Sequence, residues 1–219
     1  MKRTRVKICG ITTAEHGLAA ASAGADAIGL VFWPGTPRRV SRDVARQIVT
    51  ALPPFVSIVG LFVDPTEAEV REVMRTVRLA ALQFHGHETP EFCRQFGLPY
   101  VKAISVATGK RESDLLESAG SYADAVAWLF DAPPAGPLPG GTGQTFDWTA
   151  LPKRLHKPLV LSGGLHAGNV AEAIRIVRPW AVDVSSGVEA LDAQGRPIKG
   201  IKDASRIAAF VREVRNADA

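Results

Sequence analysis

The segment RVKICGITTAEHGLAAASAGADAIGLVF, residues 5–32, contains the first instance of a pattern that recurs along the chain. It predicts an apolar strand over residues 5–9, a helix over 13–23 and a second strand over 27–32. A strand, a helix and a strand within about thirty residues form a βαβ unit, in which the two strands run parallel in one sheet.

The same alternation continues along the chain and predicts eight strands, over residues 5–9, 27–32, 56–63, 81–85, 100–104, 125–131, 158–162 and 181–184. Helices are predicted over residues 13–23, 42–52, 67–77, 90–96, 170–177 and 202–215, with a short fifth helix over 112–119. Thr12 with Glu15 and Thr66 with Glu69 predict capping boxes. Eight strands favour a closed (β/α)8 barrel of the TIM type over a doubly wound open sheet. We therefore expect an α/β protein with one barrel domain over residues 1–219 and a weak or missing fifth helix.

After the sixth strand, residues 132–143 (APPAGPLPGGTG) cannot form a helix, because proline lacks a backbone N–H and glycine is entropically costly. Such a stretch is typical either of an interdomain linker or of a long loop. The strand pattern resumes at residues 158–162, which favours a Pro/Gly loop at the active end of one continuing barrel.

Composition excludes several classes of protein. Lys and Arg number 26 against 22 Asp and Glu, and they are scattered rather than gathered in the stripe of a nucleic-acid-binding protein. The longest apolar run, residues 56–63, is far shorter than the roughly 20 residues that span a bilayer, and no signal-peptide core follows the N-terminus. Cys9 and Cys93 form neither a disulfide framework nor a metal-binding spacing. We expect a cytoplasmic protein with free thiols, no bound metal and neither nucleic-acid nor membrane partners.

The first and sixth strands end in residues that can carry acid and base chemistry. In a (β/α)8 barrel the functional groups lie at the C-terminal ends of the strands, so Cys9 and Asp131 are expected on one rim. Each also has a plainer interpretation, as a buried core cysteine and a turn-forming aspartate. Together they could supply a base and an acid on opposite sides of a substrate.

Two glycine-bearing loops predict a phosphate site. Ser162-Gly163-Gly164-Leu165 follows the seventh strand and Ser185-Ser186-Gly187-Val188 follows the eighth. Barrels often bind phosphate at these two loops, where glycine lets backbone N–H groups approach the anion. Tight turns are the alternative interpretation, but the two motifs occur together at the expected strand ends.

Other polar residues are expected on the same rim. Gln83 and His85 alternate on the fourth strand and therefore face the same side. The loop after the second strand carries Arg38 and Arg39, whose guanidinium groups suit a carboxylate or an aromatic acid.

Strand alternation also predicts an ion pair where the barrel closes. It places Lys7 on the same side as Cys9, and Asp183 on the same side as Ser185, on strands that become neighbours upon closure. We expect Lys7 and Asp183 to pair.

These motifs resemble those of the phosphoribosylanthranilate isomerase family. The segments that carry the resemblance extend over nearly the whole chain; they are 7–12 (KICGIT), 24–29 (GADAIG), 83–86 (QFHG), 140–143 (GGTG) with 146–148 (FDW), 161–165 (LSGGL) and 182–189 (VDVSSGVE). The resemblance implies the third step of tryptophan synthesis from chorismate, without a cofactor. In that step N-(5-phosphoribosyl)anthranilate becomes 1-(2-carboxyphenylamino)-1-deoxyribulose 5-phosphate by an Amadori rearrangement.

Carried over position by position, the resemblance makes Cys9 the general base and Asp131 the general acid. Arg38 corresponds to the arginine that contacts the anthranilate moiety. Arg39 stands where the family usually has an aromatic or apolar residue, which leaves the choice between the two arginines open. The residues expected to contact the substrate are Arg38, Gln83, His85, Gly163, Gly164, Asp183, Ser185, Ser186 and Gly187. The loop after Asp131 is unusually rich in proline, and residues 191–200, longer than is common there, are expected to form a surface loop.

Two other functions stay open. The related sugar-phosphate isomerase of histidine synthesis performs the same chemistry, but normally with two aspartates and two phosphate sites in a longer chain. A barrel that only binds a phosphate ligand would need neither Cys9 nor Asp131. The expected partner is a small phosphoribosyl substrate, and both a monomer and a homodimer are compatible with the sequence.

Overall fold

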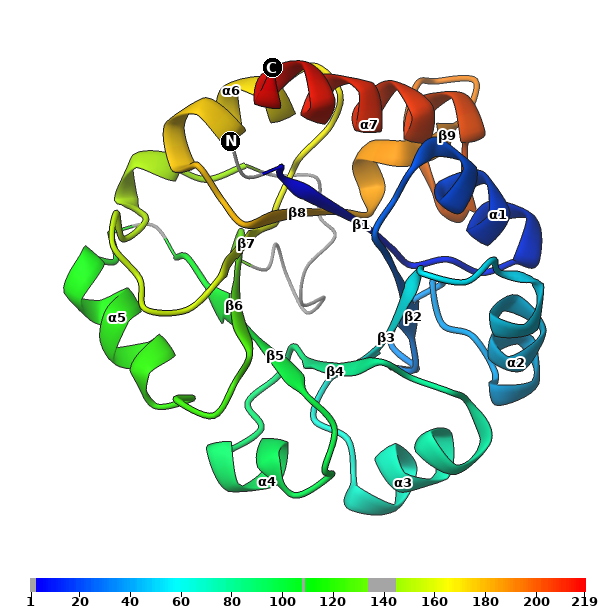
Figure 1. Cartoon of the computed structure of the whole chain (residues 1–219), viewed down its shortest axis with the longest axis horizontal. Helices are drawn as coiled ribbons and strands as arrows, with labels where there is room; N and C mark the ends of the chain where they lie inside the picture. Colours follow the sequence, from blue (N-terminus) through cyan, green and yellow to red (C-terminus); the bar gives the residue numbers. More distant parts are fainter. Residues whose placement is uncertain (1–2, 108, 134–144) are drawn as a thin grey trace.

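The computed structural model describes residues 3–107, 109–133 and 145–219. Eight parallel strands form a closed barrel, in which each strand lies beside the next one in sequence and the eighth beside the first (Figure 1). The strands are β1 (Arg5–Cys9), β2 (Ala27–Val31), β3 (Ser57–Phe62), β4 (Ala81–Phe84), β5 (Tyr100–Ser105), β6 (Ala127–Asp131), β7 (Leu159–Leu161) and β8 (Ala181–Val184). The predicted barrel is confirmed, since an open sheet would leave β1 and β8 unpaired.

Helices surround the barrel (Figure 1). They are α1 (Ala14–Ala23), α2 (Arg42–Ala51), α3 (Glu67–Thr76), α4 (Pro90–Arg94), α5 (Glu112–Gly120), α6 (Val170–Val177) and α7 (Ala204–Asp218). The fifth helix, expected to be weak or missing, is a short helix of nine residues. Between β6 and β7 the described residues contain the 3-10 turn η1 (Trp148–Ala150) and no α-helix, while residues 134–144 of the predicted Pro/Gly loop lie outside the described residues. In the described part of the chain, no helix combines the length and apolar character needed to cross a membrane.

Polar caps begin the helices largely where the residue pattern predicts them. Thr66 and Glu69 form the predicted capping box at α3, each side chain accepting the other's backbone N–H. The cap predicted at Thr12 is wrong by one residue, because Thr13 caps α1 by accepting a backbone N–H of the first turn. Thr12 instead donates its hydroxyl to the Gly200 carbonyl at 2.6 Å, a contact that no local pattern shows.

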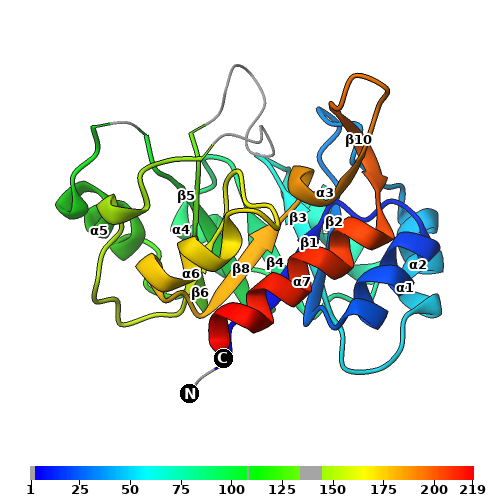
Figure 2. The ribbon, with the colours of Figure 1, turned by 90° about the horizontal axis from the view of Figure 1, so that it is seen from above.

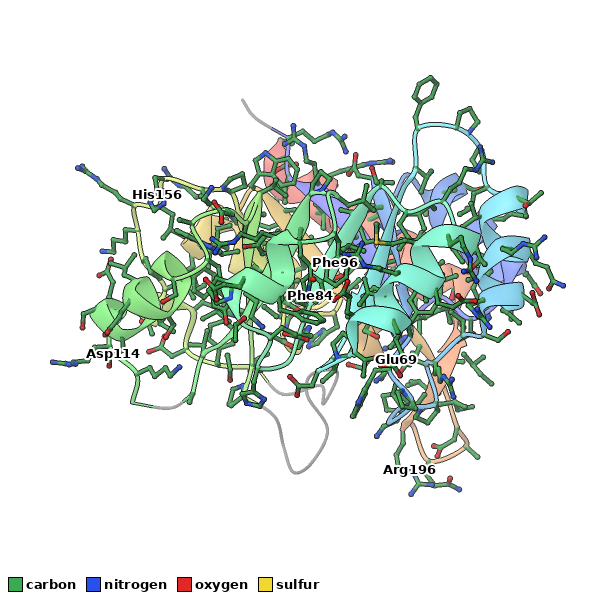
Figure 3. The ribbon with its side chains drawn as sticks, turned by 90° about the horizontal axis from the view of Figure 1, so that it is seen from below. Glu69, Phe84, Phe96, Asp114, His156 and Arg196 are labelled. Carbon is green, nitrogen blue, oxygen red and sulfur yellow. The ribbon has the colours of Figure 1, made fainter. Side chains whose placement is uncertain are left out.

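The alternation of the strands divides the core into two layers. Residues of one parity pack outward against the helices, as Phe84 on β4 does with Phe96, whose ring centroid lies 5.9 Å away (Figure 3). Residues of the other parity face the barrel interior. There an apolar layer underlies the active end; it consists of Ala127, Leu129, Val160 and Ala181. Polar side chains that face the barrel interior are also buried; they are Lys7, Gln83, Asp131 and Asp183.

A two-stranded hairpin is inserted between β8 and α7. After the 3-10 turn η2 (Ser186–Val188), β9 (Glu189–Leu191) and β10 (Pro197–Lys202) pair antiparallel. The hairpin projects from the end of the barrel opposite the chain termini (Figure 2), and Arg196 near its tip points away from the barrel (Figure 3). The predicted surface loop over residues 191–200 is therefore this hairpin, exposed at its tip and buried at its base.

Candidate active site

The predicted catalytic thiol lies at the C-terminal end of β1, where Cys9 is 6% exposed. Gly29, its register partner on β2, leaves the space that the thiol occupies, since a Cβ atom there would lie 2.7 Å from Sγ. Burial raises the pKa of the Cys9 thiol, and the charge of Lys7 opposes that effect. Asp183 also raises this pKa and Lys202 also lowers it. The free site therefore holds a neutral thiol beside ammonium groups that would stabilise a thiolate.

The ion pair predicted where the barrel closes is present. Lys7 on β1 and Asp183 on β8 are register partners, and Lys7 Nζ lies 2.9 Å from Asp183 Oδ1 with both side chains buried. Burial disfavours the Lys7 ammonium, but Asp183 and Cys9 outweigh that effect and raise the pKa of Lys7. Lys7 is thus a cation next to the thiol. Asp183, expected to contact the substrate, lies in this pair beneath the loop that begins at Ser185.

Three polar side chains form a hydrogen-bonded chain from the end of β4 to the end of β6. Asp131 is 4% exposed, and its Oδ2 lies 3.0 Å from His85 Nε2. Gln83 Nε2 lies 3.0 Å from His85 Nδ1, so Gln83 and His85 face the same side as predicted. Because an amide nitrogen only donates, His85 accepts at Nδ1 and donates its Nε2 proton to Asp131. The other Asp131 oxygen accepts the Ala132 N–H at 3.0 Å, and the carboxyl is held in one orientation.

The two glycine loops meet beside Asp131. Gly163 and Gly164 have φ angles of 88° and 61°, a backbone region that glycine adopts without strain. A Cβ atom on Gly163 would lie 3.1 Å from Asp131 Oδ1, so the loop after β7 closely approaches the predicted acid. Gly187 in the loop after β8 packs against the Leu165 carbonyl, where no side chain would fit. The predicted phosphate residues of this second loop are Ser185, Ser186 and Gly187.

Of the two arginines in the loop after β2, Arg38 turns into the rim. It is 7% exposed, and its Nε and Nη2 donate to Glu189 Oε1 and Oε2 at 2.7 and 2.8 Å. Arg39 is exposed and lines a cavity between the loops after β2 and β3, together with Glu69. The geometry therefore favours Arg38 over Arg39 as the arginine of the site, and its contact with a substrate stays a prediction.

Two buried charged residues of the rim are not predicted from the sequence. Glu189 is the first residue of β9 and Lys202 the last of β10, and both side chains are fully buried with Nζ 3.3 Å from Oε1. In a single sequence a charged residue in a loop is normally solvated. The one signal for Glu189 is its place at the end of the VDVSSGVE motif, and Lys202 has none beyond its position before the helix cap Asp203.

An apolar wall lines the rim on the side of β1, β2 and β3. Cys9, Val31 and Leu61 form a buried cluster there, and the partly buried Trp33 and Val63 pack against it. The wall adjoins the loop that carries Arg38. An aromatic ring bearing a carboxylate could therefore contact both an apolar surface and a cation here. Within the described residues, no three His, Cys, Asp or Glu side chains are grouped to hold a metal ion.

Comparison with known proteins identifies the family. The family model described as N-(5'phosphoribosyl)anthranilate (PRA) isomerase matches residues 6–213. The chain belongs to this isomerase family. The N-(5'-phosphoribosyl)anthranilate isomerase of Alcanivorax borkumensis is 53% identical over 211 residues, which cover 96% of this chain and 95% of the relative.

Solved structures of phosphoribosylanthranilate isomerases share the fold. The crystal structure of the enzyme from Thermotoga maritima is 42% identical, with a TM-score of 0.85, and the match covers 97% of this chain and 99% of that one. Another solved isomerase of the family, in complex with reduced 1-(o-carboxyphenylamino)-1-deoxyribulose 5-phosphate, is 38% identical with a TM-score of 0.79 over the same shares of the two chains. These matches assign the chain to the phosphoribosylanthranilate isomerase family rather than to the related isomerase of histidine synthesis.

Proposed function

We propose that this protein converts N-(5-phosphoribosyl)anthranilate to 1-(2-carboxyphenylamino)-1-deoxyribulose 5-phosphate in tryptophan biosynthesis. The observation that supports this most directly is the order of groups around the rim. Asp131 on β6 comes first, then the glycine loops after β7 and β8, and then Cys9 on β1. An acid and a base thus flank a predicted phosphate site. The proposed enzyme acts in the cytoplasm on a free small molecule, without a cofactor, as a monomer or homodimer.

In this proposal the substrate is held at both ends. Backbone N–H groups of the glycine loops at Gly163, Gly164 and Gly187 bind the phosphate. Arg38 faces the anthranilate carboxylate, and the apolar wall at Val31 and its neighbours contacts the aromatic ring. The sugar then lies between Asp131 and Cys9, and this positioning itself lowers the barrier.

Ring opening is the first chemical step. Protonated Asp131 gives its proton to the furanose ring oxygen as the C1–O bond breaks, and the anthranilate nitrogen forms a protonated Schiff base with C1. The carboxylate left behind accepts hydrogen bonds from His85 Nε2 and from the Ala132 N–H, both 3.0 Å away in the free protein. These two donors stabilise the charge that develops on Asp131.

Proton removal from the neighbouring carbon follows. Cys9, as a thiolate, takes the proton from C2 of the sugar, and the resulting enolamine tautomerises to the ketone as C1 gains a proton. Burial raises the pKa of the Cys9 thiol in the free protein, which opposes this role. The positive charge of the Schiff base and the ammonium of Lys7 both favour the thiolate once the ring has opened.

The proposal is tested by turnover of the substrate itself. Phosphoribosylanthranilate, generated chemically, is mixed with the purified protein, and the change in anthranilate fluorescence is followed. We expect a rate proportional to protein concentration. Binding of the compound without turnover would identify a non-catalytic barrel, and turnover only of the histidine-pathway substrate would identify the related isomerase.

A further inference from the structure

Three buried charged side chains connect the base of the hairpin to the rim of the barrel. Glu189 accepts from Arg38 with both oxygens, at 2.7 and 2.8 Å, and Lys202 Nζ lies 3.3 Å from Glu189 Oε1. The backbone N–H of Gly200 also donates to Oε1, at 2.9 Å. Two cations thus share one carboxylate, and the cluster keeps a net positive charge at the edge of the site.

Lys202 also reaches the loop predicted to bind phosphate. Its Nζ donates to the Ser185 carbonyl at 2.8 Å and lies 3.3 Å from the Ser185 hydroxyl. One ammonium group therefore contacts the first residue of the phosphate loop and, through Glu189, the guanidinium of Arg38. These are the two parts of the rim to which the proposed function assigns the two ends of the substrate.

Stability alone does not account for such a cluster. Burying charged groups carries a large desolvation penalty, and replacing buried ion pairs by apolar residues is often neutral or stabilising. Lys202 has no exposed side-chain surface, and it stands on a hairpin that lies outside the eight strands of the barrel.

We propose that Lys202 is a positioning residue that holds Arg38 and the Ser185 loop at the separation required by a ligand carrying both a carboxylate and a phosphate. This inference rests on the proposed function, because it deepens the assignment of that same site. Lys202 does not touch the substrate and acts through Glu189 and Ser185.

The charge of Lys202 can be switched in an accessible pH range. Burial lowers the pKa of Lys202 to about 8, although Glu189 opposes the effect. The other charged or titratable groups that face it are Arg38 after β2, Glu189 on β9, Cys9 on β1 and His16 on α1.

The pKa shifts of Glu189, Cys9 and His16 all run away from the interval between pH 7 and pH 9. Burial would raise the pKa of Glu189, but Arg38 and Lys202 outweigh that effect and lower it below its usual value. Burial raises the pKa of the Cys9 thiol from its usual value and lowers that of the His16 imidazole. We therefore expect a change in ligand binding between pH 7 and pH 9 to follow from deprotonation of Lys202.

The experiment measures the dissociation constant of reduced 1-(o-carboxyphenylamino)-1-deoxyribulose 5-phosphate by calorimetry at pH 7 and pH 9. Only about a tenth of a lysine with a pKa of about 8 stays protonated at pH 9, so we expect about tenfold weaker binding to the wild type there. Lys202→Arg keeps its charge and should bind with nearly the same affinity at both pH values. Lys202→Met should bind at least about tenfold more weakly than the wild type at pH 7 and lose the pH dependence.

Lys199→Met is the matched control, because Lys199 is an exposed lysine on the same strand. It should retain both the affinity and the pH dependence of the wild type. The inference is overturned if wild-type binding is the same at both pH values, or if Lys202→Arg keeps the wild-type pH dependence. If Lys202→Met does not fold, the pH dependence of Lys202→Arg compared with that of the wild type still tests the inference. Failure of the proposed function has a different signature, the absence of turnover by the wild type with phosphoribosylanthranilate.

Discussion

At the scale of single residues, Cys9 and Asp131 are both buried but have different partners. Cys9 lies near ammonium groups, whereas Asp131 accepts hydrogen bonds from His85 and from a backbone N–H. Cations favour the ionised thiol that a base requires, and neutral donors stabilise the carboxylate that an acid leaves behind. The two residues are therefore suited to opposite proton transfers.

Replacement of either group should reduce turnover with little effect on affinity. Cys9→Ser leaves a hydroxyl too weakly acidic to serve as a base, and Asp131→Asn removes the transferable proton at nearly constant shape. Since general acids and bases contribute about 10²–10⁴-fold, each variant should lose at least about 100-fold in single-turnover rate measured by fluorescence. Cys93→Ser is the control, because Cys93 is also buried but lies on α4. Near wild-type turnover by Cys9→Ser would mean that the thiol is a core residue.

Arg38 and Arg39 should differ in their effect on substrate affinity. A charge-assisted hydrogen bond contributes about 1.5–3 kcal/mol, so Arg38→Ala should raise KM about 10–100-fold. Arg39→Ala should leave KM unchanged, since the Arg39 side chain is exposed, whereas Arg38 is buried in the rim. Steady-state kinetics of the two variants compare them directly. A rise in KM confined to Arg39→Ala would shift the assignment by one residue.

At the scale of elements, the phosphate site depends on two loops rather than on any single side chain. Gly164→Val introduces a β-branched residue at a φ of 61° and blocks the approach of an anion to the backbone. Inorganic phosphate should then bind at least about tenfold more weakly in calorimetry, as expected for the loss of one charged hydrogen bond. Gly97→Val is the control, because Gly97 has a φ of 72°, open space around it and a position after α4. Equal phosphate affinity in the two variants would argue against the site.

At the scale of the whole molecule, the Lys7–Asp183 pair joins the first strand to the last. Removing one partner of a buried pair leaves an uncompensated charge and costs about 3–5 kcal/mol, so Lys7→Met should lower the free energy of unfolding by that amount. The double variant Lys7→Met/Asp183→Leu should recover most of the loss in urea denaturation. Arg71→Met, which breaks the exposed pair with Glu67 on α3, should cost less than about 1 kcal/mol. A Lys7→Met variant as stable as Arg71→Met would show that the pair has no role in closure.

The architecture follows from local features of the sequence. Strand and helix periodicity are local, so the eight strands are recognisable from consecutive residues, and β1 and β8 have the predicted bounds. Strand parity is equally local, and it correctly brought Lys7 to Asp183 and put Gln83 and His85 on one side. The motif positions then pointed to the family that the comparisons show.

The assembly of the rim, in contrast, depends on contacts between distant parts of the chain. Arg38 and Glu189 are 151 residues apart, and Lys202 is buried by the folding of a hairpin whose sequence is typical of a surface loop. The burial of Arg38 beside the exposed Arg39, and the burial that raises the pKa of the Cys9 thiol, follow from the same packing. Periodicity shows which way a side chain leaves its own strand. Charge pairing and desolvation depend on distances between separate elements, which are set when the barrel closes.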